Sequence, residues 1–351
     1  MKMKQIALAG LMALALASCQ TGRSGAGRLS PEASRVLDFI AQSQGRKALS
    51  ATMANVTWNT AEADLVHEAT GKYPAIIGLD YIDIYTDDDT AAGAYRPYDD
   101  FSVPQGWWDA GGLVTVCWHW NVPVAPDSAR LTFRPDTEFR TANMLKDGTW
   151  EHAVMAHDLG LVAKRLRQFK EAGIPVLWRP LHEAAGNTLI GGEPWFWWGN
   201  GGAEAYVALW RYMHQYFSAE GLNNLIWVWT TETGFHGGDA VVRDTAWYPG
   251  DEYVDVIGRD SYHKDCAQMV AEYEAIRQSF PNKPLTLSEC GDVATIYGQW
   301  SAGALWGWFM PWYQYKATTL SGHEWADAEW WADAANADFV AWRGDLPDFR
   351  K

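Results

Sequence analysis

Eight apolar runs of strand length recur along the chain, and stretches with helical periodicity separate several of them. They begin near residue 47 and end near residue 312, so they span most of the 351 residues. Strands that alternate with helices are typical of a parallel sheet, because each parallel connection needs a crossover. The expected strands cover residues 47–52, 74–83, 112–120, 175–183, 224–230, 253–261, 284–289 and 304–312.

Helical periodicity is clearest in three of the intervening segments. Leu159, Val162, Leu166 and Phe169 recur at intervals of three or four, and Gly173 marks a stop. Residues 206–217 and 269–280 repeat the pattern. A doubly wound open sheet would carry a glycine-rich phosphate turn after its first strand, and the sequence has none there. We therefore predict an α/β fold, a single-domain (β/α)8 TIM barrel.

Two of the expected strands end in a glutamate. Residues 174–183 run from an apolar strand into His182-Glu183, and residues 283–291 lead through a short strand to Glu289. Barrel strands deliver catalytic side chains at their C-terminal ends. Two carboxyl groups about 5 Å apart are what a retaining glycoside hydrolase needs, one as acid/base and one as nucleophile. The alternative for Glu183 is a structural carboxylate paired with Arg179.

Tryptophan is unusually abundant, with 22 residues in the chain. Flat indole faces stack on the apolar faces of sugar rings as they do on other apolar surfaces. For Trp227 and Trp229 we favour burial in the core. A sugar-stacking role is the hypothesis for the tryptophans near strand ends: Trp118, Trp120, Trp195, Trp197, Trp198, Trp306, Trp308 and Trp312.

The first residues have the pattern of an export signal. A short basic segment, Met1–Lys4, precedes an apolar run from Ile6 to Ala17 that is too short to span a bilayer. The run leads to Leu-Ala-Ser-Cys, which resembles a bacterial lipobox with cleavage before Cys19 and lipid on its thiol. An ordinary secretory signal is the alternative. We expect a signal peptide over 1–19, a flexible tether over 20–30, a catalytic domain over 31–351, and a lipid-anchored location in the bacterial cell envelope, on the periplasmic or cell-surface face of the outer membrane.

Charge and cysteine content exclude several classes of protein. Without Lys2 and Lys4 the mature chain carries 26 basic against 43 acidic side chains, a net charge of −17. This charge argues against nucleic acid as a partner. Cys117, Cys266 and Cys290 are too scattered for a disulfide framework and show no zinc spacing. At least one of the three thiols must be free in a monomer.

Four segments in a fixed order resemble glycoside hydrolase family 26, a family rich in β-mannanases. Residues 70–75 lead into the second strand with the family's pattern, and Trp178–Glu183 resembles the acid/base segment. Trp195–Gly199 resembles the aromatic run that follows, and Ser288-Glu289 resembles the nucleophile segment. The similarity extends over about residues 35–345. One departure is the stretch Ala184–Pro194, which is longer than the family's connection and should line or narrow the cleft.

The resemblance implies roles for seven residues. Glu183 corresponds to the general acid/base and Glu289 to the nucleophile. Five further positions match family residues that contact the sugar under attack or the nucleophile: His119, His182, Trp195, Tyr262 and Trp312.

The resemblance also implies a function, an endo-β-1,4-mannanase that acts on mannan, galactomannan or glucomannan by double displacement. We expect no cofactor, no metal and a monomer. The same catalytic frame acting on mixed-linkage β-glucan or β-1,3-xylan is an alternative. A metal-dependent hydrolase using His119, His182 and the glutamates is a rival enzyme class, although paired histidines on one strand are missing. A lipoprotein that captures glycans without cleaving them is a rival of another class.

Overall fold

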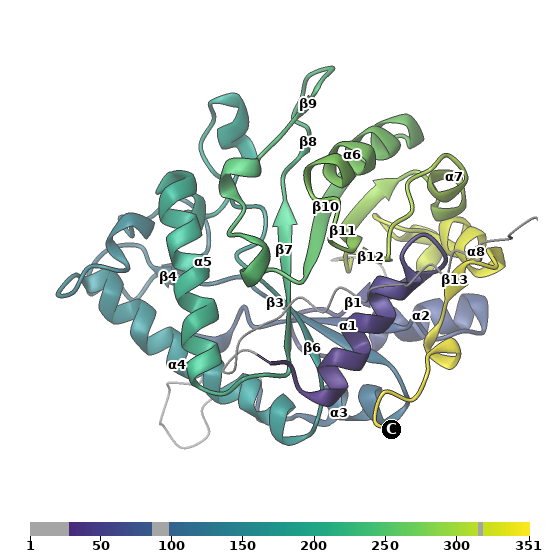
Figure 1. Ribbon diagram of the computed structural model, residues 1–351, viewed down its shortest axis with the longest axis horizontal. Coiled ribbons are helices and arrows are strands. Elements are labelled where there is room, and N and C mark those ends of the chain that lie inside the picture. The colour runs from purple at the N-terminus through teal and green to yellow at the C-terminus, as the bar shows by residue number, and fades with distance from the viewer. Residues whose placement is uncertain (1–27, 86–97, 315–318) are drawn as a thin grey trace, which may run out of the picture.

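The computed structural model describes residues 28–85, 98–314 and 319–351 (Figure 1). The signal peptide, Cys19 and residues 20–27 of the expected tether lie outside these residues. Ser30, the last residue assigned to the tether, already caps the first helix and donates its backbone N–H to the Asn223 carbonyl at 2.7 Å. Within the described residues, no helix is long and apolar enough to cross a membrane.

Eight parallel strands close into a barrel, as predicted. Neighbouring strands pair in chain order, and β12 closes the ring by pairing in parallel with β1 through Leu49–Trp308. The short strand β13 (Val340–Ala341) also pairs in parallel with the first two residues of β1, Ala48 and Leu49. The barrel strands are β1 (Ala48–Met53), β2 (Ile76–Asp80), β3 (Leu113–Trp118), β6 (Val176–Pro180), β7 (Leu225–Thr231), β10 (Val256–Lys264), β11 (Leu285–Val293) and β12 (Trp308–Pro311).

Helices surround the strands, and side-chain caps fix where several of them begin. Thr149 accepts the His152 backbone N–H at the start of α4, and Asp265 forms a capping box with Gln268 at the start of α6. Figure 1 shows α4 and α5 on one side of the strands and α8 with α2 on the other. The helices are α1 (Pro31–Ser43), α2 (Ala61–Thr70), α3 (Ser102–Asp109), α4 (Trp150–Glu171), α5 (Gly202–Ala219), α6 (Cys266–Ser279), α7 (Ile296–Ser301) and α8 (Ala328–Asn336).

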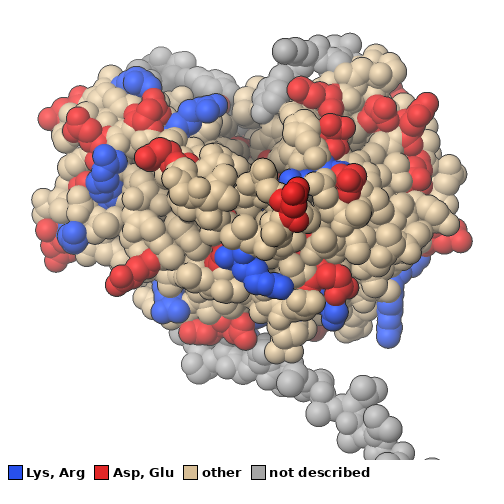
Figure 2. Space-filling model, turned by 90° about the horizontal axis from the view of Figure 1, so that it is seen from above, with Lys and Arg blue, Asp and Glu red and all other residues tan. Residues whose placement is uncertain are grey.

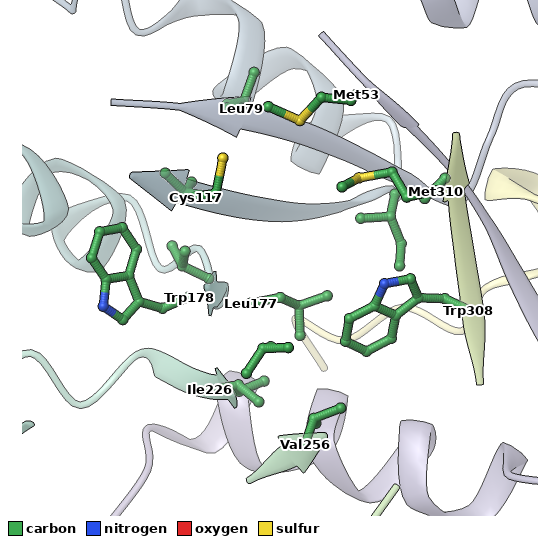
Figure 3. Packing of buried hydrophobic residues seen from close by; sticks show 14 of the residues in the cluster. Met53, Leu79, Cys117, Leu177, Trp178, Ile226, Val256, Trp308 and Met310 are labelled. Carbon is green, nitrogen blue, oxygen red and sulfur yellow. The ribbon is translucent and has the colours of Figure 1, made fainter. Parts of the chain in front are cut away.

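The interior of the barrel is filled with apolar side chains. Figure 3 shows residues from β1, β2, β3, β6, β7, β10 and β12 converging on this core. Gly78 on β2 is needed there because a Cβ at its position would lie 2.6 Å from the Met310 sulfur and 2.7 Å from the Met53 sulfur. The two methionines therefore occupy the space that a larger residue on β2 would fill.

Most of the tryptophans assigned to sugar stacking lie in the core, so that prediction was wrong for them. Trp118 and Trp120 stack on each other with ring centroids 4.1 Å apart, and the Trp120 indole N–H donates to Asp158. The predicted burial of Trp227 and Trp229 is confirmed. Among the described residues, the indole N–H groups of Trp118, Trp229 and Trp308 have no acceptor, so packing alone holds these three rings in the core. The six stacking candidates that are buried are Trp118, Trp120, Trp197, Trp198, Trp306 and Trp308.

The remaining sequence features agree with the structure. Cys117, Cys266 and Cys290 are all free thiols. Figure 2 shows acidic side chains spread over the face seen from above, with basic side chains scattered between them and no continuous basic patch.

Candidate active site

A single cleft at the C-terminal ends of the strands contains all seven predicted site residues. It has a volume of about 980 Å³ and is lined by Glu183, Glu289 and the five predicted substrate-binding residues, with both walls built from loops that follow the strands. The size is that of a ligand-binding pocket. One carboxylate oxygen each of Glu183, Asp260 and Glu289 lie within 4.8 Å of one another. This separation fits a retaining mechanism and leaves too little room for the water of an inverting one.

Glu289 lies at the centre of a network of donors. The Tyr262 hydroxyl donates to its Oε1 at 2.6 Å, and Arg179 Nη2 donates to its Oε2 at 2.6 Å. Both donors favour the carboxylate form, which a nucleophile requires. Tyr262 therefore lies where the family resemblance placed it, in contact with the nucleophile, and Arg179 is a second donor.

Arg179 links the nucleophile to a second buried carboxyl group. Its Nη1 donates to Asp260 Oδ2 at 2.8 Å, and the Ser288 hydroxyl donates to Asp260 Oδ1 at 2.7 Å. Burial raises the pKa of Asp260 to about 7, with Arg179 opposing the shift and Glu289 adding to it. Arg179 therefore neutralises part of the negative charge of two neighbouring carboxyl groups.

Glu183 has different surroundings. Among the described residues, no donor contacts its carboxyl group, so the alternative of a structural ion pair with Arg179 is wrong. Burial, together with the charges of Glu232, Asp260 and Glu289, raises the pKa of Glu183 well above its usual value. A carboxyl group that keeps its proton near neutral pH is what a general acid requires.

Two histidines lie side by side in the wall of the cleft, and their pKa values are shifted in opposite directions. Asp80 accepts a bond from His119 Nδ1 at 2.6 Å and one from the His119 backbone N–H at 3.0 Å. Burial lowers the pKa of His119, but the Asp80 carboxylate outweighs it and the net shift is upward. Burial lowers the pKa of His182 well below its usual value, with Arg179 and His119 adding to the effect. The two rings meet edge to face at 4.6 Å.

Trp195 and Trp312 are the two stacking candidates that line the cleft. Trp195 is 37% exposed, whereas Trp312 is largely buried with its ring 5.9 Å from that of His119. The stretch 184–194 lines the cleft through Asn187, Ile190, Glu193 and Pro194, as predicted. Gly186, in the left-handed region at φ +33°, lies below Trp195, since a Cβ there would lie 3.2 Å from the indole ring. The long connection therefore supports Trp195.

Sequence reasoning did not find three charged residues around the site. Asp80 follows an apolar strand and was not singled out, and Glu232 lies two residues beyond the predicted end of its strand. Arg259 lies on β10 and lines the cleft, with Nη1 3.3 Å from Glu232 Oε2. The available signal was the position of Asp80 and Glu232 at the C-terminal ends of β2 and β7, whereas Arg259 lies within β10 and offered none.

The residues suggested for a metal-dependent hydrolase do not assemble into one site. In the part of the chain that the structure describes, the groupings with metal-ligand geometry are Asp80 with Cys117 and His119, and Glu183 with Asp260 and Glu289. Neither contains both histidines. In the second group, Arg179 already contacts two of the three carboxylates.

The fold and the cleft define a class of protein. A (β/α)8 barrel whose cleft holds two carboxyl groups within 4.8 Å of each other, one on β11 and one just after β6, is the arrangement of a retaining glycoside hydrolase. The sequence matches the model of glycosyl hydrolase family 26 over residues 27–326. The chain belongs to this family.

Its relatives and structural neighbours carry related names. Mannan endo-1,4-beta-mannosidase B of Piromyces sp is 29% identical over 291 residues, which are 80% of this chain and 47% of that protein. The GH26 domain of an endo-beta-mannanase/endo-beta-glucanase from Prevotella bryantii is 36% identical, with a TM-score of 0.83 over 90% of this chain and 97% of that one. A beta-mannanase from a symbiotic protist of the termite Reticulitermes speratus, complexed with gluco-manno-oligosaccharide, is 30% identical, with a TM-score of 0.74 over 91% of this chain and 96% of that one. The chain spans about half the length of the Piromyces relative.

Proposed function

We propose that this protein is an endo-β-1,4-mannanase that cleaves mannan, galactomannan or glucomannan with retention of configuration. The observation that carries the proposal is the carboxyl pair in the cleft: Glu183 and Glu289 within 4.8 Å, the first without a donor and the second held by Tyr262 and Arg179. The names of the relatives support mannan as the substrate.

In the proposed first step Glu289 attacks the anomeric carbon while Glu183 gives its proton to the leaving oxygen. The bond from the anomeric carbon to that oxygen breaks, and a glycosyl ester forms on Glu289. Ester formation removes the negative charge of Glu289, which contributes to the raised pKa of Glu183. Glu183 then accepts a proton from water, whose oxygen displaces Glu289 from the sugar.

His119, His182, Trp195 and Trp312 are proposed to hold the sugars on either side of the bond that breaks. His182 and the His119 ring, which is held by Asp80, offer ring nitrogens for hydrogen bonds to sugar hydroxyls. Trp195 offers an exposed indole face for stacking.

Product analysis tests the proposal. Wild type, Glu289→Ala and Glu183→Ala are incubated with galactomannan, glucomannan, barley β-glucan and β-1,3-xylan. Mannobiose and mannotriose released by wild type alone, with the β-anomer formed first in proton NMR, are expected. Cleavage confined to β-glucan or xylan would replace the proposed substrate, and substrate binding without turnover by wild type would favour a glycan-capturing protein.

We further propose that the chain is a bacterial lipoprotein anchored in the cell envelope through Cys19. The basic start, the short apolar run and the small residues before Cys19 support this. Wild type and Cys19→Ser are expressed in a bacterium with a lipid-labelling precursor. Label and membrane fractionation in wild type alone are expected, whereas an unlabelled, soluble wild type contradicts the anchor.

A further inference from the structure

Glu232, the residue directly after β7, is a fully buried carboxyl group that does not reach the cleft. Its Oε2 lies 3.3 Å from Arg259 Nη1, but its Oε1 has no hydrogen-bond partner among the described residues. An unpartnered buried carboxylate oxygen is costly, so a group that keeps one calls for an explanation.

The sheet register places Glu232 beside the acid/base. Trp178 on β6 pairs with Trp227 on β7, and Glu183 and Glu232 each lie five residues beyond that pair. The two carboxyl groups therefore follow neighbouring strands of the barrel. The charge of Glu232 is, after burial, the largest contribution to the raised pKa of Glu183.

Charged groups surround Glu232 from each neighbouring element. Arg259 on β10 is its only cationic contact within the described residues, and Glu272 on α6 binds the same guanidinium at 3.1 Å. Asp244 accepts the Glu232 backbone N–H at 2.6 Å, and His236 Nε2 lies 4.0 Å from Glu232 Oε2. Glu232 therefore has two acidic neighbours, one guanidinium and one imidazole.

A second set of charged groups faces Glu183. Asp260 on β10 and Glu289 on β11 repel its charged form, and Arg179 on β6 attracts it without contacting it. The nearest cation that could favour ionisation on the β7 side is Arg259, which is held by Glu232 and Glu272.

We propose that Glu232 is a positioning residue that keeps the proton on Glu183, because it is buried, follows the strand next to that of the acid/base and takes the contact with Arg259. The inference rests on the proposed function. Arg259 contacts Glu232 and not Glu183, so the first charge of the carboxyl pair forms on Glu232. That charge disfavours a second one on Glu183. Glu183 thereby stays protonated at a pH where an isolated buried carboxyl group would begin to ionise.

The pKa directions agree with an effect of the Glu232 charge on Glu183. Burial raises the pKa of Glu232 to about 8, and Arg259 opposes the shift. The pKa of Glu183 is raised well above its usual value as well, and the charge of Glu232 contributes to that rise. The effect of Glu232 is therefore strongest on the alkaline side of the activity profile.

The test is the pH dependence of kcat/KM for mannohexaose in wild type and Glu232→Gln. Glutamine keeps the shape and removes the charge, so Glu183 loses its proton at lower pH. The basic limb, which reports the acid in the free enzyme, should move down by about one pH unit. With a dinitrophenyl mannoside as substrate, the basic limb should be absent in both wild type and Glu232→Gln, because the dinitrophenolate leaving group needs no proton.

Two further variants separate this role from a structural one. Glu272→Gln removes the other carboxylate from Arg259 without touching Glu183, and its basic limb should not move to lower pH. Glu232→Asp keeps the charge and the ion pair with Arg259, so its basic limb should lie near that of wild type. This variant tests the proposal if Glu232→Gln does not fold. A wild-type limb in folded Glu232→Gln, or a full downward shift in Glu232→Asp, would overturn the inference. Absence of any mannan cleavage by wild type would instead refute the proposed function.

Discussion

The buried pair of Asp80 and His119 allows a stability prediction to be worked from the structure. Asp80 Oδ2 accepts the imidazole Nδ1–H at 2.6 Å and Oδ1 accepts the backbone N–H of the same residue at 3.0 Å. Both side chains are nearly inaccessible to solvent. Asp80→Asn keeps the shape of the side chain and one acceptor oxygen but removes the charge.

The expected loss follows from the strength of these two bonds. Hydrogen bonds to a charged group contribute about 1.5–3 kcal/mol each, and neutral ones about 1 kcal/mol. His119 can release its proton when Asp80 is replaced, so the variant is not left with a buried unpaired cation. We therefore expect Asp80→Asn to lower the free energy of unfolding by about 2–3 kcal/mol, below the cost of breaking a buried pair outright.

The pH dependence of this loss has a definite sign. The pKa of His119 is raised in the folded state, because Asp80 outweighs the opposing effect of burial. Its stabilisation is therefore complete below the unfolded-state value of about 6.5 and is lost as pH rises through the folded value. The pKa of Asp80 is lowered, since burial opposes but the His119 charge and bonds prevail. Its contribution is lost as pH falls below about 4. The difference between wild type and variant should be largest between these limits.

Urea unfolding followed by tryptophan fluorescence at pH 5.5 and pH 9 measures this difference. Asp292→Asn is the matched control, because His263 and Asp292 form the same kind of pair at 2.9 Å with both side chains about two-thirds exposed. Exposed pairs contribute little, so this control should unfold like wild type. An equal loss in the two variants, or a loss in Asp80→Asn that is as large at pH 9 as at pH 5.5, would refute the reasoning.

Three further variants test other parts of the site. Arg179→Gln leaves two carboxylates without their shared cation and should lower the free energy of unfolding by about 3–5 kcal/mol in urea; a loss below about 1 kcal/mol contradicts the role of the arginine. Gly291→Ala places a Cβ 2.4 Å from the Trp325 ring and 2.8 Å from that of Tyr262, so the shift of Tyr262 should lower kcat on mannan about a hundredfold, and unchanged turnover speaks against it. Trp195→Ala should raise KM for mannohexaose roughly three- to tenfold with a small effect on kcat; a loss confined to kcat would exclude a stacking role.

The barrel could be predicted from the sequence because its strands are buried on both faces and read as apolar runs. Glu183 and Glu289 could be predicted as site residues for the same reason, since each follows such an apolar run. The locations of the tryptophans could not be predicted in this way, because an indole at a strand end can lie either in the core or in the cleft. The buried Trp120 indole N–H, for example, donates to Asp158, which lies 38 residues later in the sequence on α4. Sequence spacing contains no sign of that contact.

The conformation of the acid/base segment shows why the position of Glu183 after a strand did not predict how its side chain reaches the cleft. The strand β6 ends at Pro180, and Leu181 and Glu183 both adopt the left-handed region, at φ +51° and +52°, although neither is glycine. Each such residue costs roughly 1–2 kcal/mol. The chain thereby leaves the strand direction and brings Glu183 into the cleft.

Downstream side chains offset the cost of this strained turn. The Tyr206 hydroxyl donates to the Leu181 carbonyl at 3.1 Å, and the Trp198 indole N–H donates to the His182 carbonyl at 2.8 Å. Two hydrogen bonds of about 1 kcal/mol each are comparable to the strain. Trp198 was expected to bind sugar, but its contacts make it a support for the acid/base instead. Within the aromatic run after His182-Glu183, Trp198 thus holds the backbone that presents Glu183, whereas Trp195 is the tryptophan that is exposed to the cleft.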